Sequence, residues 1–304
     1  MAAPSLCNRT RLHNLGKMTA RVCVVGSVNM DTVFDVAALP RPGETVLASS
    51  ARSTPGGKGA NQAVAAARAG AQVQFVGAVG EDASGERLRA HLCENKVGID
   101  GLVTLPHPSG AAVVMVDSAG ENAIVVAPGA NGHLTLDSDR ARAVIADCDV
   151  LLLQLEIPVP TATAAARAAR TAGAVVMLNA SPPADELGEL AKLTDVLIVN
   201  EAEAQHWHWP VPHRVITRGA AGATYASAHA QFAVPAPAVE VIDTAGAGDV
   251  FAGVLAAEWT TDRGPALRRA CAAGALATLI PGAGDCAPPR EAIDDVIANI
   301  EGEP

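Results

Sequence analysis

Aromatic residues are scarce in this sequence, at 3% of 304 residues, although hydrophobic residues make up 49%. Ala, Val and Leu dominate, so we expect an aliphatic core, and the length suits one large α/β domain or two smaller ones. No apolar run approaches the roughly 18 residues that a membrane-spanning helix needs, so we expect no membrane partner.

Positive charge is also in short supply. Lys and Arg number 22 against 32 Asp and Glu, which gives a net charge of −10. An acidic surface disfavours non-specific binding to nucleic acid, so we expect no nucleic-acid partner. An anionic substrate is not excluded, because a binding site sets its own local field.

Paired cysteine motifs are missing. The six cysteines are scattered without a Cys-x-x-Cys pair, which predicts reduced thiols in a cytoplasmic protein. His206 and His208 have no partner cluster, so zinc is not expected. Residues 1–17 carry basic residues without a long apolar core, a poor secretory signal, and we expect them to form a disordered tail.

From about residue 18 onward, strand-like and helix-like segments alternate. Strands are expected near 21–26, 71–80, 149–156, 174–180, 195–200 and 214–218, and helices near 58–70, 83–96, 161–173 and 201–207 and from about 247, 265 and 290. This rhythm predicts a three-layer α/β/α domain with a mostly parallel central sheet. Additional strands near 31–52 and 111–127 interrupt it, and we expect them to form a small projecting β-sheet.

The stretch "TAGAGDVFAG" (residues 244–253) does not match two familiar phosphate loops. The P-loop pattern fails at "PGGKGAN", where Gly59 follows the lysine in place of Ser or Thr. The dinucleotide-binding pattern fails at "GAGDVF", where Phe251 stands at the third glycine position.

The same stretch is nonetheless suited to an anion. Gly246 and Gly248 allow backbone N–H groups to converge at the start of a helix, where the helix dipole favours negative charge. Asp249 follows directly, and one interpretation is that it caps the helix. The other is that Asp249 removes the proton from a hydroxyl that attacks a phosphorus atom.

Seven motifs occur together: "GSVNMD", "TPGGKGANQAVAAARAG", "GAVGEDASG", "QLE", "VNEAE", "ITRGAAG" and "DTAGAGDVFAG". In this order and spacing they resemble the ribokinase–fructokinase superfamily of carbohydrate kinases, the pfkB family. "GSVNMD" with "GGKGANQA" is similar to its ribokinase branch. The resemblance covers about residues 18–304 and implies one kinase domain in which the small sheet is a lid. It also implies phosphorylation of D-ribose at its 5-hydroxyl by ATP, giving D-ribose 5-phosphate and ADP.

The resemblance implies a sugar-binding set in three motifs and at the turn: Asn29, Met30, Asp31, Gly57, Lys58, Gly59, Asn61, Glu156 and Asp249. The paired glycines of the second motif would let the lid close. The residues alone leave plainer interpretations open, namely a strand-end turn for the first motif and a solvated strand end for Glu156.

The resemblance also implies where ATP and metal ions bind. The nucleotide set is Asn200, Thr217, Arg218, Gly219, Ala220, Gly222 and Gly248. Glu203 would organise Mg²⁺, mostly through water, although a capped acidic helix start explains "NEAE" as well. Arg218 stands where the family usually has an apolar residue, which leaves the details of that loop open.

In the turn, Asp249 would be the catalytic base, and Gly246, Ala247 and Gly248 would stabilise the transferring phosphoryl group. A monovalent cation, usually K⁺ in this family, would be bound by Asp243, Ala245, Ala277, Ile280, Gly282 and Cys286. Cys286 stands where serine is common.

The family's lid strands often pair between subunits, so the resemblance implies a homodimer. Two alternatives stay open. One is a kinase for another acceptor, such as deoxyribose, fructose or adenosine. The other is a non-catalytic sugar or nucleotide sensor, which the presence of Asp249 and the whole anion-binding motif argues against.

Overall fold

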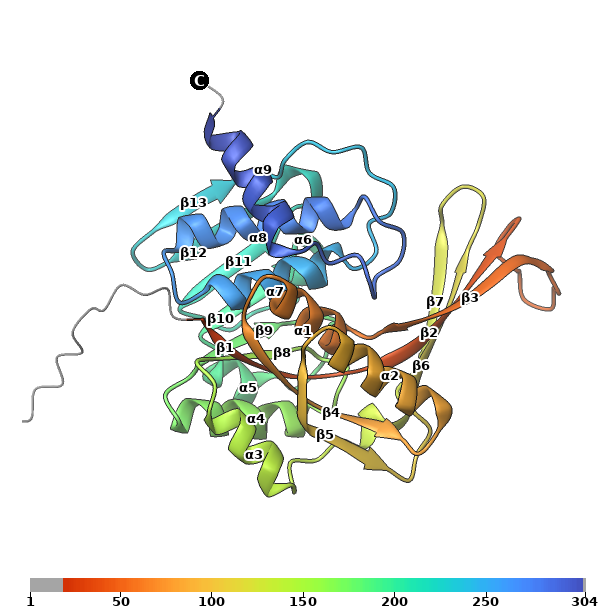
Figure 1. Ribbon diagram of the computed structural model, residues 1–304, viewed down its shortest axis with the longest axis horizontal. Coiled ribbons are helices and arrows are strands. Elements are labelled where there is room, and N and C mark those ends of the chain that lie inside the picture. Colours follow the sequence, from red (N-terminus) through yellow and green to blue (C-terminus); the bar gives the residue numbers. More distant parts are fainter. Residues whose placement is uncertain (1–18, 303–304) are drawn as a thin grey trace, which may run out of the picture.

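A nine-stranded sheet separates two layers of helices (Figure 1). The computed structural model describes residues 19–302, so the predicted tail over 1–17 lies outside the described residues. The strand order is β13-β12-β11-β10-β9-β8-β1-β4-β5, parallel from β11 to β5 and antiparallel at β12 and β13. The strands are β1 (Arg21–Val25), β4 (Gln72–Gly80), β5 (Gly98–Leu105), β8 (Val150–Leu153), β9 (Val175–Asn179), β10 (Val196–Asn200), β11 (His213–Thr217), β12 (Ala223–Ser227) and β13 (Gln231–Val234).

Both faces of the sheet are buried, because alternate side chains of each central strand enter different cores. In β1, Val22 and Val24 belong to one hydrophobic cluster, whereas Cys23 and Val25 belong to the other. The first cluster is covered by α1 (Lys58–Arg68), α2 (Ala83–Glu94), α7 (Ala247–Glu258), α8 (Arg263–Ala277) and α9 (Arg290–Gly302). The second is covered by α3 (Asp139–Ala146), α4 (Val159–Thr171) and α5 (Gly188–Leu193). Shorter helical elements lie between the strands of the described chain, namely α6 (Glu201–Ala204), η1 (Gly129–His133) and η2 (Gly219–Ala221).

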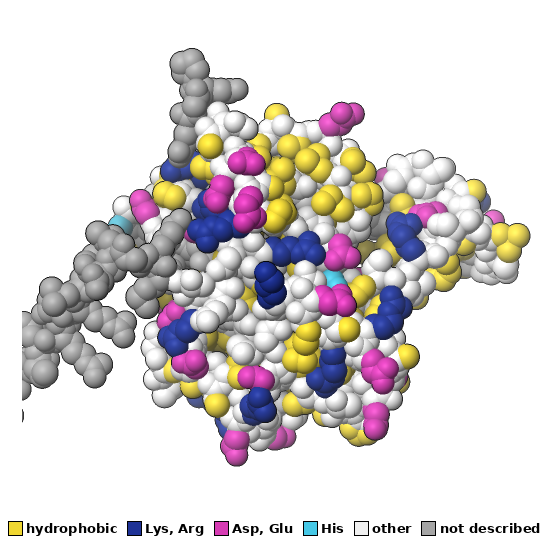
Figure 2. All heavy atoms as spheres, in the orientation of Figure 1, with side chains coloured by type: hydrophobic (Ala, Val, Ile, Leu, Met, Phe, Trp, Pro, Cys, Tyr) yellow, Lys and Arg dark blue, Asp and Glu magenta, His cyan; other side chains and the backbone are white. Residues whose placement is uncertain are grey.

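A second sheet projects from the domain (right of Figure 1). It contains β2 (Asn29–Val36), β3 (Ala48–Gly56), β6 (Gly110–Val116) and β7 (Asn122–Ala127), in the order β3-β2-β6-β7. Its far end carries apolar side chains on the surface, visible in Figure 2. The predicted fold, a mostly parallel α/β sheet with a small separate sheet, is confirmed.

Other expectations need correction. Strand β5 and helices α3 and α5 were not predicted, and α6 ends at Ala204 although a helix over 201–207 was expected.

Within residues 19–302, none of the helices is long and apolar enough to cross a bilayer. The cytoplasmic location stays a prediction.

One carboxylate joins the two sheets. Asp82 is the N-cap of α2, and its Oδ1 accepts hydrogen bonds from Gly85 N (2.7 Å) and Ser109 Oγ (2.6 Å). Its Oδ2 accepts from Ser109 N (2.8 Å), directly before β6. Burial acts to raise the pKa of Asp82, but the hydrogen bonds from Ser109 and Gly85 together outweigh it and hold the pKa below its usual value.

We therefore expect Asp82→Ala to lower the free energy of unfolding by about 1–2 kcal/mol at pH 7. Because the folded-state pKa lies below the unfolded one, this stabilisation is present above about pH 4 and is lost as pH falls through the folded value. Urea unfolding at neutral and acidic pH measures it. Glu81→Ala, at the exposed neighbour, is the control. Equal stability of the two variants at pH 7 would contradict the account.

Candidate active site

The predicted functional residues converge at the carboxyl edge of the parallel strands, where open α/β sheets place their ligands. Asn200 ends β10, Thr217 ends β11, and Glu156 lies just beyond β8. A cleft of about 200 Å³ lies at this edge. It is lined by Lys58, Asn179, Ser181, Ile198, Val199, Asn200, Glu203, Thr217, Gly246, Gly248 and Asp249.

The glycine turn begins helix α7. Gly246 is the N-cap and has left-handed backbone angles (φ 77°), and a Cβ there would lie 2.8 Å from the backbone of Ala283. Nothing lies within 4 Å of where a Cβ of Gly248 would point, so the backbone is bare on that side. The first N–H groups of a helix have no partner within the helix, so this turn offers donors to an anion in the cleft. One of them, Ala247 N, already donates to the Thr244 carbonyl oxygen at 3.3 Å.

Asp249 stands in the first turn of α7 and is 7% exposed. Its carboxylate binds to α1: Oδ2 accepts from Asn61 Nδ2 (3.0 Å) and Oδ1 from Gln62 Nε2 (2.9 Å). The helix has no side-chain cap, and these bonds lead away from its own backbone. The interpretation of Asp249 as a helix cap therefore finds no support in the geometry.

Asp31 extends from the small sheet toward this carboxylate. Burial, followed by the negative charges of Glu156 and Asp249, raises the pKa of Asp31 to about 7. Its Oδ1 is enclosed and finds no partner among the described residues. A Cβ on Gly56 would lie 2.1 Å from Asp31 Oδ2, so β3 approaches closely only because it has glycine there. An enclosed acceptor without a donor is suited to a ligand hydroxyl.

Asn29 and Glu156 are held by neighbours. The buried Asn29 accepts a hydrogen bond from Asn131 Nδ2 (2.8 Å), and Glu156 accepts from the backbone N of Lys58 (3.1 Å) and from the Ser27 hydroxyl. Glu156 is thus not a freely solvated strand-end side chain.

Met30 differs from the rest of the predicted sugar-binding set. It alternates with Asn29 and Asp31 along β2, and its side chain is buried in the hydrophobic core. The structure therefore separates the Met30 side chain from the polar groups beside it.

Lys58 is the first residue of α1. The pKa of Lys58 is raised, chiefly by the negative charge of Asp249. Burial lowers the pKa, whereas the charges of Glu156 and Glu203 raise it further. Gly57, at φ 89°, and Gly59 flank it. A Cβ at Gly57 would lie 2.8 Å from the backbone of Asn29, so the helix start fits tightly against β2.

On the opposite side of the cleft, Asn200 and Glu203 form a capping box. Asn200 N donates to Glu203 Oε2 and Glu203 N donates to Asn200 Oδ1, each at 2.8 Å. The plainer interpretation of "NEAE" is therefore correct for the helix start, yet both side chains also line the cleft. Arg218 is exposed and pairs with Glu201 at 3.1 Å, and the turn η2 with Gly219 and Ala220 is exposed beside it, followed by Gly222.

The predicted cation-binding residues lie in two neighbouring loops. Asp243 joins them, because its Oδ1 accepts from Ala245 N (2.9 Å) and its Oδ2 from Gly282 N (2.8 Å). The Cys286 thiol lies 3.8 Å from the Ala245 carbonyl oxygen. Ala277 and Ile280 are bonded through their backbones at the end of α8. Among residues 19–302 no cluster of three His, Cys, Asp or Glu side chains could hold a metal ion.

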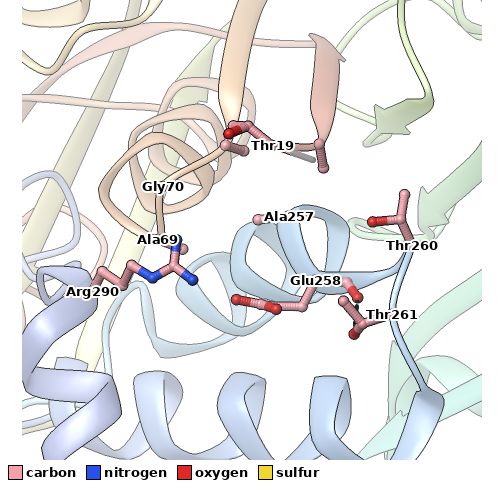
Figure 3. A pocket seen from close by; sticks show the side chains of 10 residues that line it. Thr19, Ala69, Gly70, Ala257, Glu258, Thr260, Thr261 and Arg290 are labelled. Atoms are coloured by element: carbon pink, nitrogen blue, oxygen red, sulfur yellow. Dashed lines mark hydrogen bonds between the residues drawn. The ribbon is translucent and has the colours of Figure 1, made fainter. Parts of the chain in front are cut away.

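A second, smaller pocket of about 60 Å³ contains none of the predicted residues (Figure 3). It lies between Thr19, the end of α1, the end of α7 and Arg290 at the start of α9. The acidic group facing it, Glu258, is paired with Arg269 at 2.8 Å. The Glu258 carboxylate at this pocket is therefore already engaged in an ion pair.

Four site amides were not predicted: Gln62, Asn131, Gln154 and Asn179. A sequence signal existed for Gln62, which follows Asn61 in "GGKGANQA" and is polar within an otherwise Ala-rich helix. Gln154 is the first residue of the motif "QLE", whereas Asn131 and Asn179 lie outside the seven motifs.

The raised pKa of Asp31 leads to a stability prediction. Between about pH 4 and 7 the folded protein keeps a proton that the unfolded chain releases, so stability falls as pH rises through this window. We expect Asp31→Asn, which has no charge to bury, to be more stable than the wild type at pH 8 by about 1–4 kcal/mol. The difference should vanish near pH 4. Thermal unfolding at the two pH values measures it, and a variant less stable than the wild type at pH 8 would contradict the prediction.

Comparison with known proteins identifies the family. The model of the pfkB family carbohydrate kinase matches residues 19–290. The ribokinase of Bacillus subtilis is 34% identical over 290 residues, 91% of this chain and 99% of that protein. A bifunctional ribokinase/ribose-5-phosphate isomerase A of Fructilactobacillus sanfranciscensis is also 34% identical, over 302 residues. The match covers 91% of this chain but only 56% of that longer protein.

A solved structure agrees. The Arabidopsis thaliana ribokinase complexed with ribose and ATP has a TM-score of 0.84 and 30% identity, covering 92% of this chain and 99% of that one. The prediction of a carbohydrate kinase is confirmed. The chain belongs to the pfkB family of carbohydrate kinases.

Proposed function

We propose that the protein transfers the γ-phosphoryl group of ATP to the 5-hydroxyl of D-ribose, giving D-ribose 5-phosphate and ADP. One observation carries the proposal: the Asp249 carboxylate is buried at the amino end of α7, beside a bare glycine turn and within the cleft. The ribokinase names of the relatives, and the ribose and ATP bound to one of them, support the choice of substrates.

The sugar would occupy the side of the cleft toward the small sheet. Asp31 has an enclosed oxygen without a donor, and Glu156 and Asn61 approach from the main domain. Hydroxyl groups of a sugar can donate to such carboxylate oxygens and accept from the amide. Glu156 and Asp249, whose negative charges raise the pKa of Asp31, repel it in the absence of a ligand. Hydrogen bonds from the sugar hydroxyls would offset this repulsion.

In the reaction, Asp249 would accept the proton of the sugar's 5-hydroxyl while the oxygen of that hydroxyl attacks the γ-phosphorus of ATP. The bond between that phosphorus and the bridging oxygen of ADP breaks. The N–H groups of Gly246, Ala247 and Gly248 and the Lys58 ammonium would stabilise the charge on the moving phosphoryl group. The nucleotide would lie along Asn200, Thr217 and the turn that follows.

Two cations fit the proposal. Glu203 contributes one carboxylate on the side of the cleft near Asn200, which suits Mg²⁺ held mainly by water and phosphate oxygens, and the ion would neutralise phosphate charge. For K⁺, the loops joined by Asp243 offer backbone carbonyls beside the glycine turn. Cys286 would contribute through its backbone, because burial raises the pKa of its thiol to about 11 and keeps it neutral.

Two alternatives remain. A different sugar or nucleoside acceptor, such as deoxyribose, fructose or adenosine, would use the same base and turn. A sensor without catalysis would need neither, so the buried, hydrogen-bonded Asp249 favours an enzyme.

We expect release of ADP from MgATP to require D-ribose and Asp249. Asp249→Asn should lower kcat by about 100- to 10,000-fold, because a general base contributes roughly 10²–10⁴ to the rate. Replacing K⁺ by tetramethylammonium should lower the rate severalfold. A coupled assay with D-ribose, deoxyribose, fructose and adenosine measures these effects.

Binding of D-ribose to Asp249→Asn, measured by calorimetry, is the control that the variant is folded. Turnover only with another acceptor would show that D-ribose is not the substrate, while the proposed mechanism would stand. Wild-type kcat in Asp249→Asn would overturn the role of the base.

We further propose that residues 18–304 form one kinase domain in which β2, β3, β6 and β7 are a lid that also joins two subunits. The edge strand β7 exposes apolar side chains on both of its faces, with Ile124 at 56% and Val126 at 45% on one face and Val125 at 65% on the other. Such a surface on strands with an open edge favours pairing with a second copy.

We expect Val125→Asp to shift the protein from dimer to monomer, because a buried carboxylate would face the partner's apolar side chains. Light scattering after size-exclusion chromatography measures the mass. Ile300→Asp changes an exposed apolar residue on α9 and is the matched control. A monomeric wild type, or a dimer that Val125→Asp leaves intact, would refute the proposed interface.

A further inference from the structure

We infer that Gln62 is a positioning residue for the catalytic carboxylate, and that Gln154 fixes Gln62 in turn. This inference rests on the proposed function of Asp249. The observation behind it is a continuous chain of buried amides that ends on the carboxylate. The chain consists of Gln154, Gln62 and Asn179, contributed by three separate parts of the fold.

The contacts form one path. Gln154 Nε2 donates to Gln62 Oε1 at 2.6 Å, and Gln62 Nε2 donates both to Asp249 Oδ1 at 2.9 Å and to Asn179 Oδ1 at 3.0 Å. Asn179 Nδ2 donates to the Ile198 carbonyl at 3.2 Å. Gln62 comes from α1, Gln154 follows β8, and Asn179 ends β9.

The direction of each bond follows from the carboxylate. An ionised Asp249 only accepts hydrogen bonds, so Gln62 must present its NH₂ group. That group has two hydrogens, and the second one goes to Asn179. The Gln62 oxygen is then free to accept from Gln154, which prevents the Gln62 amide from turning over. The orientation of one side chain is thus fixed at both ends.

Solvent does not reach the bond between the two glutamines, because both are 0% exposed. Loss of the Gln62 amide would leave Asp249 Oδ1 and Asn179 Oδ1 without this donor and Gln154 Nε2 without its acceptor, and an unmade hydrogen bond inside a protein is costly. The Asp249 carboxylate would then rotate or shift, and a displacement of about 1 Å at a reacting group can cost roughly 100-fold in rate.

Asn61 and Gln62 differ in what they do for Asp249. Asn61 holds the other oxygen, Oδ2, and belongs to the predicted sugar-binding set. A sugar hydroxyl can therefore take its place on that oxygen. Gln62 lies in the buried amide chain, so its bond to Asp249 Oδ1 persists when a sugar binds. This bond fixes the orientation of the Asp249 carboxylate.

A purely structural role would look different. Helices α1 and α7 pack so closely that a Cβ on Gly253 would lie 2.3 Å from the Gln62 backbone oxygen. If Gln62 served only this packing, its side-chain amide could be replaced by an apolar group of the same length with a change in stability alone. A positioning role predicts a change in kcat with substrate binding retained.

The test is Gln62→Met, which keeps the length of the side chain and removes its amide. We expect kcat to fall about 10- to 100-fold. The KM values for D-ribose and ATP should stay within about threefold of the wild type, since the loss concerns the reacting geometry. Gln74→Met, at a half-buried glutamine of β4 whose amide oxygen accepts from Asp100 N, is the matched control and should keep wild-type kcat.

A second variant covers failure of Gln62→Met to fold. Gln154→Met leaves the Asp249 contact in place and removes only the bond that orients Gln62, so kcat should fall by about 2- to 10-fold with unchanged KM. Wild-type kcat in a folded Gln62→Met, or in Gln154→Met when the first variant is unfolded, overturns the inference. A rise in KM at constant kcat also overturns it.

Asp249→Asn, assayed in parallel, separates this inference from the proposed function. An inactive Asp249→Asn together with a fully active Gln62→Met refutes only the positioning role. An Asp249→Asn enzyme with wild-type kcat refutes the proposed function itself.

Discussion

A buried carboxylate surrounded by donors and facing a cation is the interaction on which the rest of this site depends. Asp249 is 7% exposed, and a charge so placed is tolerated only where hydrogen bonds and opposite charge replace water. Asn61 and Gln62 supply the hydrogen bonds, and the raised pKa of Lys58 reflects the charge of Asp249. Helix α1 therefore has to begin at the cleft, which requires the close approach that Gly57 permits.

The burial of negative charge also accounts for the electrostatic repulsion around Asp31. Three carboxylates, those of Asp31, Glu156 and Asp249, share a small region, and Asp31 responds with a pKa of about 7. In the proposed function this cost to stability is offset when a sugar binds, because its hydroxyl groups would donate hydrogen bonds to the carboxylates. The small sheet carries Asp31, so its position and the electrostatics of the cleft are linked.

Much of this could be predicted from the sequence. Apolar runs alternating with Ala-rich helices predicted the mostly parallel sheet, and the motif order predicted the family. Strand β5 escaped prediction because two glycines and scattered exposure hide its pattern, and α3 and α5 because they are short. The amide chain escaped because Gln62 and Gln154 are 92 residues apart, and the motifs that contain them do not show that the two side chains meet. Met30 is the reverse case, since it lies in the predicted sugar-binding motif while its side chain packs in the hydrophobic core.

The most direct measurement is the position of the phosphoryl group in the product. Incubation with MgATP and D-ribose labelled with ¹³C at carbon 5 should give a product whose ³¹P resonance couples to that carbon, together with one ADP per sugar consumed. Such a result is what a base at Asp249 and an anion-binding turn in one cleft predict. Inorganic phosphate in place of a sugar phosphate, or a phosphoryl group on another carbon, would contradict the account.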